Sequence, residues 1–195
     1  ETPYVKLVTQ LFGERMMVAN ATGCSSIYGG SAPATPYTTN ANGEGPSWAS
    51  SLFEDNAEYG FGMFLGVETL RHRIETIMTN TMNEVSAELQ GLYKEWIENR
   101  ADGNKTTELR NKIVPLLANE NGQGAKEILA LKQYLVKKSQ WIFGGDGWAY
   151  DIGYGGLDHV LASGEDVNIL VMDTELYSNT GGQASKSSPT ASVEK

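Results

Sequence analysis

Apolar residues in the middle of the chain recur at steps of three and four, a period that is typical of amphipathic helices. The pattern runs from about residue 59 to residue 101 and predicts one long helix or two. Further helices are expected over residues 108–118 and 124–138. Residues 59–138 are therefore predicted to form a helical segment, and the methionines on its apolar face are interpreted as core residues.

The two ends of the chain show a different pattern. A helix with proline in its first turn is expected over residues 3–12, followed by a strand over 15–20. Two short apolar runs, at 141–143 and 167–173, flank a helical stretch at 148–163. Nearly continuous apolar strands are typical of parallel sheets that are buried on both faces. Strand, helix and strand in succession predict a right-handed βαβ unit.

A long stretch between the first strand and the helical segment is dense in Gly, Pro, Ser, Thr and Asn, and it is predicted to be a loop. It falls within residues 16–58 and contains Cys24, Tyr28, Tyr37 and Trp48. Loops of this length inside a compact domain are usually functional or disordered. Because aromatic residues argue against disorder, we expect a partner domain or a ligand to order it.

These elements together predict an α/β fold, with three layers, a mostly parallel sheet and a long helical insertion. Residues 1–195 are expected to form a single domain. It would contain the long loop within 16–58, the helical segment 59–138 and a glycine-rich motif region over 141–195. No internal repeat is apparent.

Composition narrows the classes of partner. The chain has 195 residues, 40% of them hydrophobic, and a net charge of −9. Such a surface repels nucleic acid and anionic membranes, and no apolar run approaches the roughly 20 residues of a membrane span. The single cysteine cannot form an internal disulfide, so a cytoplasmic location is expected. The start at Glu1, without Met, is interpreted as an internal piece of a longer chain or a processed product.

The candidate chemistry lies where two predicted strands end. Asp146 stands among glycines directly after one strand, and Thr174 follows the next. In open α/β sheets, ligands bind beyond the carboxyl ends of the strands. A carboxylate and a hydroxyl there suit Mg²⁺, which usually bridges a carboxylate and a phosphate group, and the N-terminus of the following helix favours an anion. The alternative is that Asp146 only caps that helix while the glycines make the turn.

Three stretches carry a resemblance to a known family. GDGWAYDIGYGGLDHVL and VMDTELYSNTGGQASKSSPT resemble the thiamine-diphosphate motif of 2-oxoacid oxidoreductases. NATGCSSIYGGSAPATPYTTNANGEGPSWASSLFEDNAEYGFGM is similar to the pyruvate:ferredoxin (or flavodoxin) oxidoreductases. The resemblance runs from end to end of the chain, but it covers only the thiamine-diphosphate-binding domain of a much longer polypeptide. It implies the thiamine-diphosphate-binding form of the α/β fold.

The resemblance also implies roles for individual residues. Asp146 would bind Mg²⁺ through its carboxylate, Thr174 through its side-chain oxygen and Leu176 through its backbone carbonyl. Many thiamine enzymes carry Asn where Thr174 stands, and Thr likewise supplies one neutral oxygen. Asn179 is implied as a catalytic residue close to the reactive ring of the cofactor. The other implied contacts to thiamine diphosphate come from Glu1, Cys24, Gly145, Gly147, Trp148, Glu175, Tyr177 and Ser178.

Cys24 has a second implied role, as one of the four thiolates of a 4Fe-4S cluster. The other three cysteines would lie outside this chain, so the cluster would exist only in the full-length protein. From the residues alone, a lone cysteine such as Cys24 is more often a buried core thiol, and it is the surrounding motif that favours the cluster. The carboxylate that activates thiamine is expected from another domain, because Glu44, Glu54 and Asp55 are interpreted as solvated loop charges. The isolated chain is therefore expected to bind the cofactor weakly and to be inactive.

The implied activity is that of a pyruvate:ferredoxin oxidoreductase, of the EC 1.2.7.1 type. Coenzyme A-dependent oxidative decarboxylation of pyruvate would give acetyl-CoA and carbon dioxide. Electrons would pass through iron–sulfur clusters to ferredoxin or flavodoxin, and the full-length protein would be a homodimer. Two alternatives stay open: another thiamine-dependent 2-oxoacid oxidoreductase or decarboxylase, and a non-catalytic α/β binding module. A decarboxylase would not need the cluster thiolate of Cys24.

Overall fold

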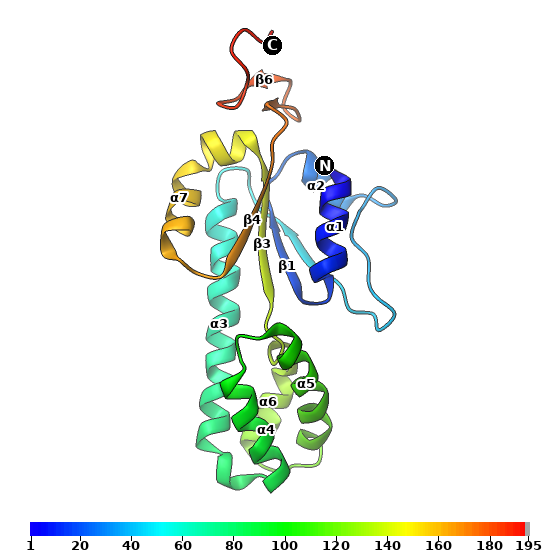
Figure 1. Cartoon of the computed structure of the whole chain (residues 1–195), viewed down its shortest axis with the longest axis vertical. Coiled ribbons are helices and arrows are strands. Elements are labelled where there is room, and N and C mark those ends of the chain that lie inside the picture. The colour runs from blue at the N-terminus through cyan, green and yellow to red at the C-terminus, as the bar shows by residue number, and fades with distance from the viewer. Residues whose placement is uncertain (194–195) are drawn as a thin grey trace. The chain divides into compact units, whose positions relative to one another are not determined.

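The computed structural model describes residues 1–193, which fall into two compact units. The sheet unit comprises the described residues 1–64 and 139–193, and the helical unit comprises Leu65–Lys138. Figure 1 shows strands only in the sheet unit, whereas the helical unit consists of helices and their connections. No helix within residues 1–193 is long and apolar enough to cross a membrane.

A four-stranded sheet forms the centre of the sheet unit, and all of its strands run parallel in the order β2-β1-β3-β4. The strands are β1 (Met16–Asn20), β2 (Ser47–Ser50), β3 (Ser139–Gly145) and β4 (Val167–Met172). The strands predicted at 15–20, 141–143 and 167–173 are thereby confirmed. The β3–β4 pair is the predicted βαβ unit.

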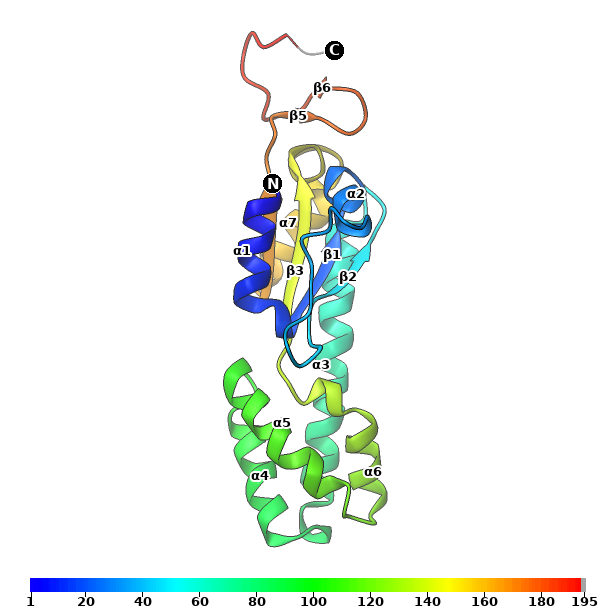
Figure 2. The ribbon, with the colours of Figure 1, turned by 90° about the vertical axis from the view of Figure 1, so that its right-hand side faces the viewer.

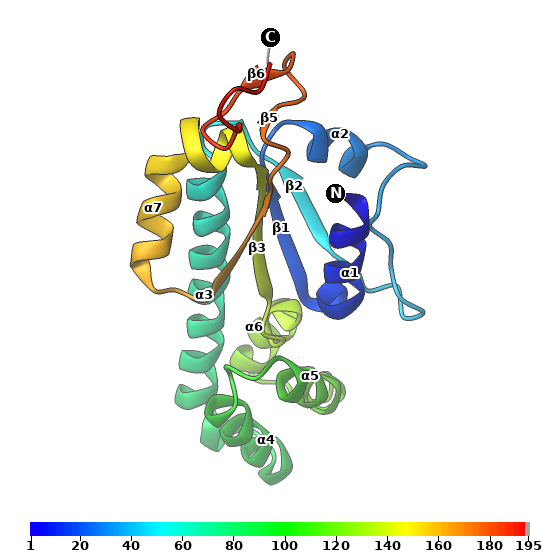
Figure 3. The ribbon, with the colours of Figure 1, turned by 45° about the horizontal axis from the view of Figure 1, so that its top comes forward.

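Helices cover both faces of this sheet, as Figure 3 shows with α1 and α7 on opposite sides of the strands. Helix α1 (Thr2–Phe12) packs Val5 against Val18 and Phe143 on one face. Helix α7 (Tyr154–Ser163) packs Leu157 and Val160 against Ile142 on the other. Alternate strand residues thus enter different cores, as the period of two requires. The three-layer α/β/α prediction is confirmed.

The predicted long loop is partly wrong, because it contains a helix and a strand. Helix α2 spans Cys24–Gly30, and the edge strand β2 lies within the same stretch. Both are short and rich in small polar residues, so neither shows an apolar period. The helix packs closely on the strand: a Cβ at Gly29 would lie 2.9 Å from the Trp48 ring. Tyr37 also contacts Trp48, so the aromatics order this stretch from within.

The helix predicted over 148–163 is divided in the structure. A π-helix, Gly147–Ile152, comes first, and α7 begins at Tyr154. Gly153 stands at the junction, where a Cβ would lie 2.5 Å from the Trp148 ring. A π-helical turn holds more residues than an α-helical turn. Because the π-helix spans only six residues, the spacing of its apolar residues is too short a pattern to reveal the break.

The helical unit contains most of α3 (Asn56–Asn80), followed by α4 (Ala87–Glu98), α5 (Gly103–Leu117) and α6 (Gln123–Ala130). Figure 2 shows the last three helices gathered around one another. The two-helix interpretation of residues 59–101 is confirmed, since a 3-10 turn at Met82–Glu84 separates α3 from α4. The core of this unit is built from Ile74, Met78, Leu89, Tyr93, Trp96, Leu109, Ile113, Leu117, Ala125, Ile128 and Leu135.

After β4 the chain forms a small antiparallel hairpin, β5 (Leu176–Tyr177) with β6 (Gln183–Ala184). The turn between them contains Gly181 and Gly182, and Gly182 has a φ of 80°. This left-handed conformation suits glycine, which has no Cβ. The residues that follow β6 fold back toward the end of β3, as described below.

Candidate functional site

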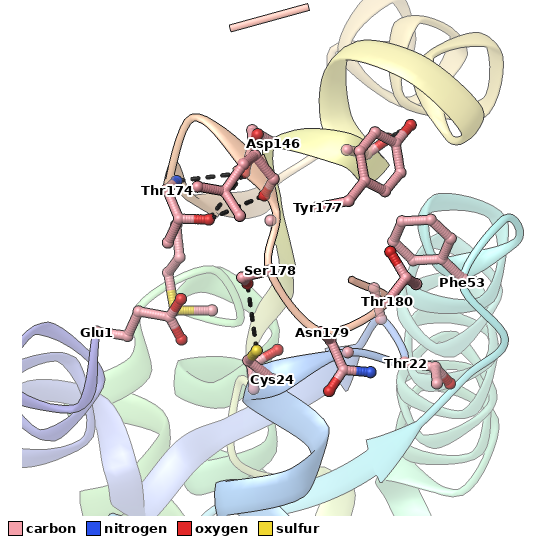
Figure 4. A pocket seen from close by; sticks show the side chains of 17 residues that line it. Glu1, Thr22, Cys24, Phe53, Asp146, Thr174, Tyr177, Ser178, Asn179 and Thr180 are labelled. Carbon is pink, nitrogen blue, oxygen red and sulfur yellow. Dashed lines mark hydrogen bonds between the residues drawn. The ribbon is translucent and has the colours of Figure 1, made fainter. Parts of the chain in front are cut away.

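The carboxyl end of the sheet opens on a cavity, and the segments that follow β1, β3 and β4 form its walls (Figure 4). This position is the one that open α/β sheets use for ligands. The structure brings together all but two of the residues that the sequence singled out. Those lining the cavity are Glu1, Cys24, Gly145, Asp146, Gly147, Thr174, Leu176, Tyr177, Ser178 and Asn179.

The two exceptions are Trp148 and Glu175. The Trp148 side chain is fully buried and packs in the core beneath the site, with Leu157 and Val160. A Cβ at Gly144 would lie only 2.3 Å from its ring, so this glycine leaves room for the indole. Glu175 is exposed, and its φ of 63° places it at a tight turn between two cavity residues. The indole is therefore a support of the cavity rather than part of its wall.

Three oxygens from separate residues converge at one end of the cavity. The hydroxyl of Thr174 lies 3.3 Å from Oδ1 of Asp146 and 3.2 Å from the carbonyl oxygen of Leu176. The expectation that Asp146 and Thr174 are neighbours is confirmed. The sheet register accounts for it, because Gly145 pairs with Met172 and the residues that follow both strands emerge together.

Asp146 is 1% exposed, and both of its carboxylate oxygens accept hydrogen bonds. Oδ1 accepts from the backbone N–H of Thr174 at 3.2 Å as well as from its hydroxyl. Oδ2 accepts from the hydroxyl of Ser187 at 3.0 Å and from that of Ser185. Burial by itself would raise the pKa of Asp146, but the hydrogen bonds from Ser185, the Thr174 N–H and Ser187 outweigh it and lower the pKa. The group is an ionised carboxylate near neutral pH.

The capping interpretation of Asp146 is not what the structure shows. Asp146 precedes the π-helix, but its side chain makes no capping hydrogen bond to it. The carboxylate turns instead toward the segments that follow β4 and β6. A buried carboxylate beside a cavity, held by donors from distant parts of the chain, is the arrangement of a binding site rather than of a helix end.

The aromatic ring of Tyr177 closes a second side of the cavity. Its hydroxyl donates to Asp151 at 3.0 Å, and its ring contacts Phe53 edge to face. A Cβ at Gly147 would lie 2.6 Å from this ring, so the glycine permits the close approach. Burial, followed by the neighbouring Asp151, raises the pKa of Tyr177, which keeps its hydroxyl protonated.

Cys24 lies at the start of α2, on the side of the cavity away from Asp146 and Thr174. Its Sγ is 3.3 Å from the hydroxyl of Ser178 (Figure 4). The thiol is half-buried and faces the cavity, so the alternative of a buried core thiol does not hold. Glu1 lines the same cavity, near Tyr28. Burial, followed by the Glu1 carboxylate, raises the pKa of Tyr28. The Tyr28 hydroxyl donates to Sδ of Met172 at 3.2 Å.

Several residues of the site were not anticipated. The hydroxyls of Ser185 and Ser187 reach Asp146 from the end of the chain, and the remaining wall residues were not singled out individually. Those remaining residues are Ala21, Thr22, Gly23, Ser25, Phe53, Met172 and Thr180. The run of hydroxyl residues after β6 is visible in the sequence, but no periodicity there indicates which of them meets the carboxylate.

Acidic side chains are scarce in the cavity. Asp146 and Glu1 are the carboxylates that line it, and Glu44, Glu54 and Asp55 do not. Among residues 1–193, no group of three or more His, Cys, Asp or Glu side chains could hold a metal ion. A cation here would therefore depend on hydroxyl and carbonyl oxygens, and on oxygens that a ligand brings.

Comparison with known proteins gives no matching family model, but it finds close relatives. The chain is 57% identical over 199 residues to pyruvate-flavodoxin oxidoreductase from Klebsiella pneumoniae. It is 56% identical over 203 residues to pyruvate:ferredoxin oxidoreductase from Moorella thermoacetica. A mitochondrial pyruvate dehydrogenase (NADP+) from Euglena gracilis is 53% identical over 199 residues. Each match covers 100% of this chain, which spans only 17%, 17% and 11% of the respective relatives.

Proposed function

The chain corresponds over its whole length to one segment of the pyruvate-flavodoxin and pyruvate:ferredoxin oxidoreductase family, and we propose that this segment binds thiamine diphosphate through Mg²⁺. The observation that carries the proposal is the convergence of three oxygens, from Asp146, Thr174 and Leu176, at the edge of a cavity. The same three residues are the Mg²⁺ ligands that the motif resemblance implies.

The spacing of these oxygens fits an octahedral ion. Mg²⁺–oxygen bonds of about 2.1 Å at right angles separate neighbouring ligand atoms by about 3.0 Å. The separations of 3.3 and 3.2 Å around the Thr174 hydroxyl need to contract only slightly. One carboxylate is also the complement that Mg²⁺ uses when phosphate groups supply further ligands. Within residues 1–193, Asp146 and Glu1 are the carboxylates that line the cavity, and a phosphate group would supply the further oxygens that Mg²⁺ needs.

The rest of the cavity suits a diphosphate ester. A chain with a net charge of −9 needs local attraction for such an anion, and the ion at Asp146 would provide it. Gly145 and Gly147 leave the backbone accessible beside the carboxylate. Asn179 and Ser178 line the cavity away from the three oxygens, where the ring portion of the ligand would lie (Figure 4). This placement supports Asn179 as the residue nearest the reactive ring.

When bound, thiamine diphosphate supplies the carbanion stabilisation that decarboxylation of a 2-oxoacid requires. The residues of this chain bind and orient it: Asp146, Thr174 and Leu176 hold the ion, while Tyr177 and Phe53 close one side of the cavity. Proton removal also needs a general acid–base group at the ring. Since Asp146 is engaged with four donors and Glu1 lies beside Tyr28, we assign that carboxylate to another domain. The isolated chain should therefore bind without turning over.

Cys24 is proposed as one thiolate of a 4Fe-4S cluster that needs three cysteines from outside this chain. Its thiol lines the cavity proposed for thiamine diphosphate, which supports electron transfer away from the cofactor. This placement favours an oxidoreductase over a simple decarboxylase. The whole enzyme would oxidise pyruvate with coenzyme A, pass electrons to ferredoxin or flavodoxin and act as a homodimer. The Euglena relative is named for NADP+, so the final acceptor is not a property of this segment.

Titration of thiamine diphosphate into the chain, with and without Mg²⁺, tests the proposal by calorimetry or tryptophan fluorescence. We expect Mg²⁺-dependent binding that Asp146→Ala abolishes. Asp158→Ala is the matched control, since it removes an exposed carboxylate of α7 that does not line the cavity. Binding that does not need Mg²⁺, or that survives in Asp146→Ala, would contradict the proposal.

A further inference from the structure

We propose that Ser185 and Ser187, which follow β6, are positioning residues for the metal site. They hold Oδ2 of Asp146 so that Oδ1 stays with Thr174 and Leu176 at the cavity. The inference rests on the proposed function, because it assigns the binding of Mg²⁺ to that group of oxygens. It adds a second set of contacts to the carboxylate, supplied by a segment that does not line the cavity.

The two oxygens of Asp146 have different partners. Oδ1 faces Thr174, whose hydroxyl also contacts the Leu176 carbonyl. Oδ2 accepts from the two serine hydroxyls, from residues 39 and 41 positions further along the chain. One oxygen is thus placed for an ion, and the other is fixed by the protein. Both functions can be fulfilled at once, because they do not compete for the same oxygen.

Orientation matters here because a carboxylate is free to rotate. The terminal torsion of Asp is broad and roughly two-fold, so an unrestrained group would exchange its oxygens or tilt away from the ion. Groups that hydrogen-bond to metal-ligating carboxylates typically affect metal affinity 10- to 100-fold. At 1% exposure, Asp146 has little water to replace lost donors.

The number of acceptors available to each hydroxyl proton indicates which of the two serines contributes more to orienting Asp146. Each hydroxyl has one proton to donate. Ser187 has three acceptors within reach: Asp146 at 3.0 Å, Asp173 at 3.0 Å and the Ser185 oxygen at 2.9 Å. Ser185 has only two acceptors among these groups, Asp146 and the Ser187 oxygen, and its own oxygen accepts the backbone N–H of Ser187 at 3.2 Å, which favours donation of its proton to the carboxylate. Ser185 should therefore contribute more than Ser187.

The residue between them provides a comparison. Lys186 contacts Asp151 rather than Asp146, with its N–H at 3.3 Å and its Nζ at 3.6 Å. Its side chain is 70% exposed. Lys186→Ala therefore perturbs the same turn without removing a donor to the metal-site carboxylate, whereas the serine substitutions remove donors and leave the exposed ion pair.

The test measures the concentration of Mg²⁺ that gives half-maximal binding of thiamine diphosphate, in the 195-residue chain. We expect a rise of about 10-fold or more for Ser185→Ala, a smaller rise for Ser187→Ala and the largest for the double variant. Lys186→Ala and Ser192→Ala should match the wild type. Ser185→Thr retains the hydroxyl and should bind with the affinity of the wild type. Excess Mg²⁺ should recover binding in the alanine variants, which it would not do if the tail were merely misfolded.

The outcomes separate this inference from the proposed function. A wild-type chain without Mg²⁺-dependent binding overturns both. A wild-type chain that binds, with a double alanine variant of equal Mg²⁺ dependence, overturns the inference alone. An equal loss in Lys186→Ala also overturns it, since the turn as a whole, and not the two hydroxyls, would then be responsible.

Discussion

The two units of this chain both bury charged groups, but they engage them in different ways. In the helical unit, the guanidinium of Arg71 is 1% exposed and donates to the carbonyl oxygens of Tyr134, Leu135 and Arg100. In the sheet unit, Asp146 is equally buried but accepts from hydroxyls at a cavity. One charge connects segments of backbone, and the other lies at the wall of a cavity. Burial of a charge alone therefore does not identify a functional site.

The environment of Arg71 is complete without a ligand. Besides the carbonyls, its Nε lies 3.4 Å from Glu68, and its guanidinium lies over the Trp96 ring at 5.2 Å. Burial lowers the pKa of Arg71 to about 10, which leaves it charged at neutral pH. The Asp146 site differs because Asp146 lines a cavity that protein atoms do not fill. The useful criterion is whether a buried charge borders a cavity.

The largest effect that would test this comparison is expected from Arg71→Met. The substitution removes the guanidinium donor from the carbonyls of Tyr134, Leu135 and Arg100, and it leaves Glu68 paired with Arg100 alone of its two cations. We expect a loss of about 3–5 kcal/mol in the free energy of unfolding, because each hydrogen bond from a charged donor contributes about 1.5–3 kcal/mol. Arg73→Met is the control, since that side chain is 61% exposed and its ion pair with Glu127 is a surface pair, and it should change stability by less than about 1 kcal/mol. Denaturant unfolding measures both, and similar losses would remove the distinction.

A smaller effect on stability is expected in the sheet unit from Gly144→Ala. The new Cβ would meet the Trp148 ring at 2.3 Å, and the ring is fully buried beneath the cavity. Overpacking of this kind typically costs about 1–3 kcal/mol. Gly155→Ala is the matched control in α7, where nothing lies within 4 Å of the new Cβ. It should stabilise the chain by about 0.5–1 kcal/mol, because alanine favours the helix. If both variants unfolded at the same denaturant concentration, close packing under the cavity would not be limiting.

The smallest effect is on the pH dependence of stability, and it further distinguishes Asp146 from Arg71. Since the folded-state pKa of Asp146 is lowered, its ionisation stabilises the fold above the unfolded pKa of about 3.9. That contribution is lost as the pH falls through the lower folded pKa. Wild type should therefore exceed Asp146→Asn in stability at pH 7, and the difference should shrink in acid. Denaturant titrations at several pH values check this; a gap that widened in acid would contradict the assignment.

The sheet unit was predictable where strands are apolar and where a chemical group stands at a strand end. Strands β3 and β4 are nearly continuous apolar runs, and Asp146 and Thr174 follow them directly. Helix α2 and strand β2 were missed, because they are short and are stabilised by tertiary contacts such as Gly29 on Trp48. The π-helix at Gly147–Ile152 was missed because a local change of helical period leaves no signature in an apolar pattern.

The residues that line the cavity were predictable, but the residues that hold Asp146 in place were not. The resemblance placed the residues that face the cavity, with Trp148 turned into the core as the clearest difference. The hydroxyls of Ser185 and Ser187 could not be inferred, since their contact with Asp146 depends on how the chain turns after β6. Long-range contacts made by a turn follow from folded geometry rather than from local periodicity.

The parallel register of β3 and β4 has a consequence for how this chain tolerates insertions and deletions. Gly145 pairs with Met172, so one residue added within either strand would turn its side chains to the opposite face and separate Asp146 from Thr174. The turn after α7, which includes Gly164 with a φ of 69°, lies at the other end of the strands. Extra residues there would lengthen a surface connection without altering either strand end. Length variation among functional variants should accordingly collect at the turn around Gly164, while the segments next to Asp146 and Thr174 keep a fixed length.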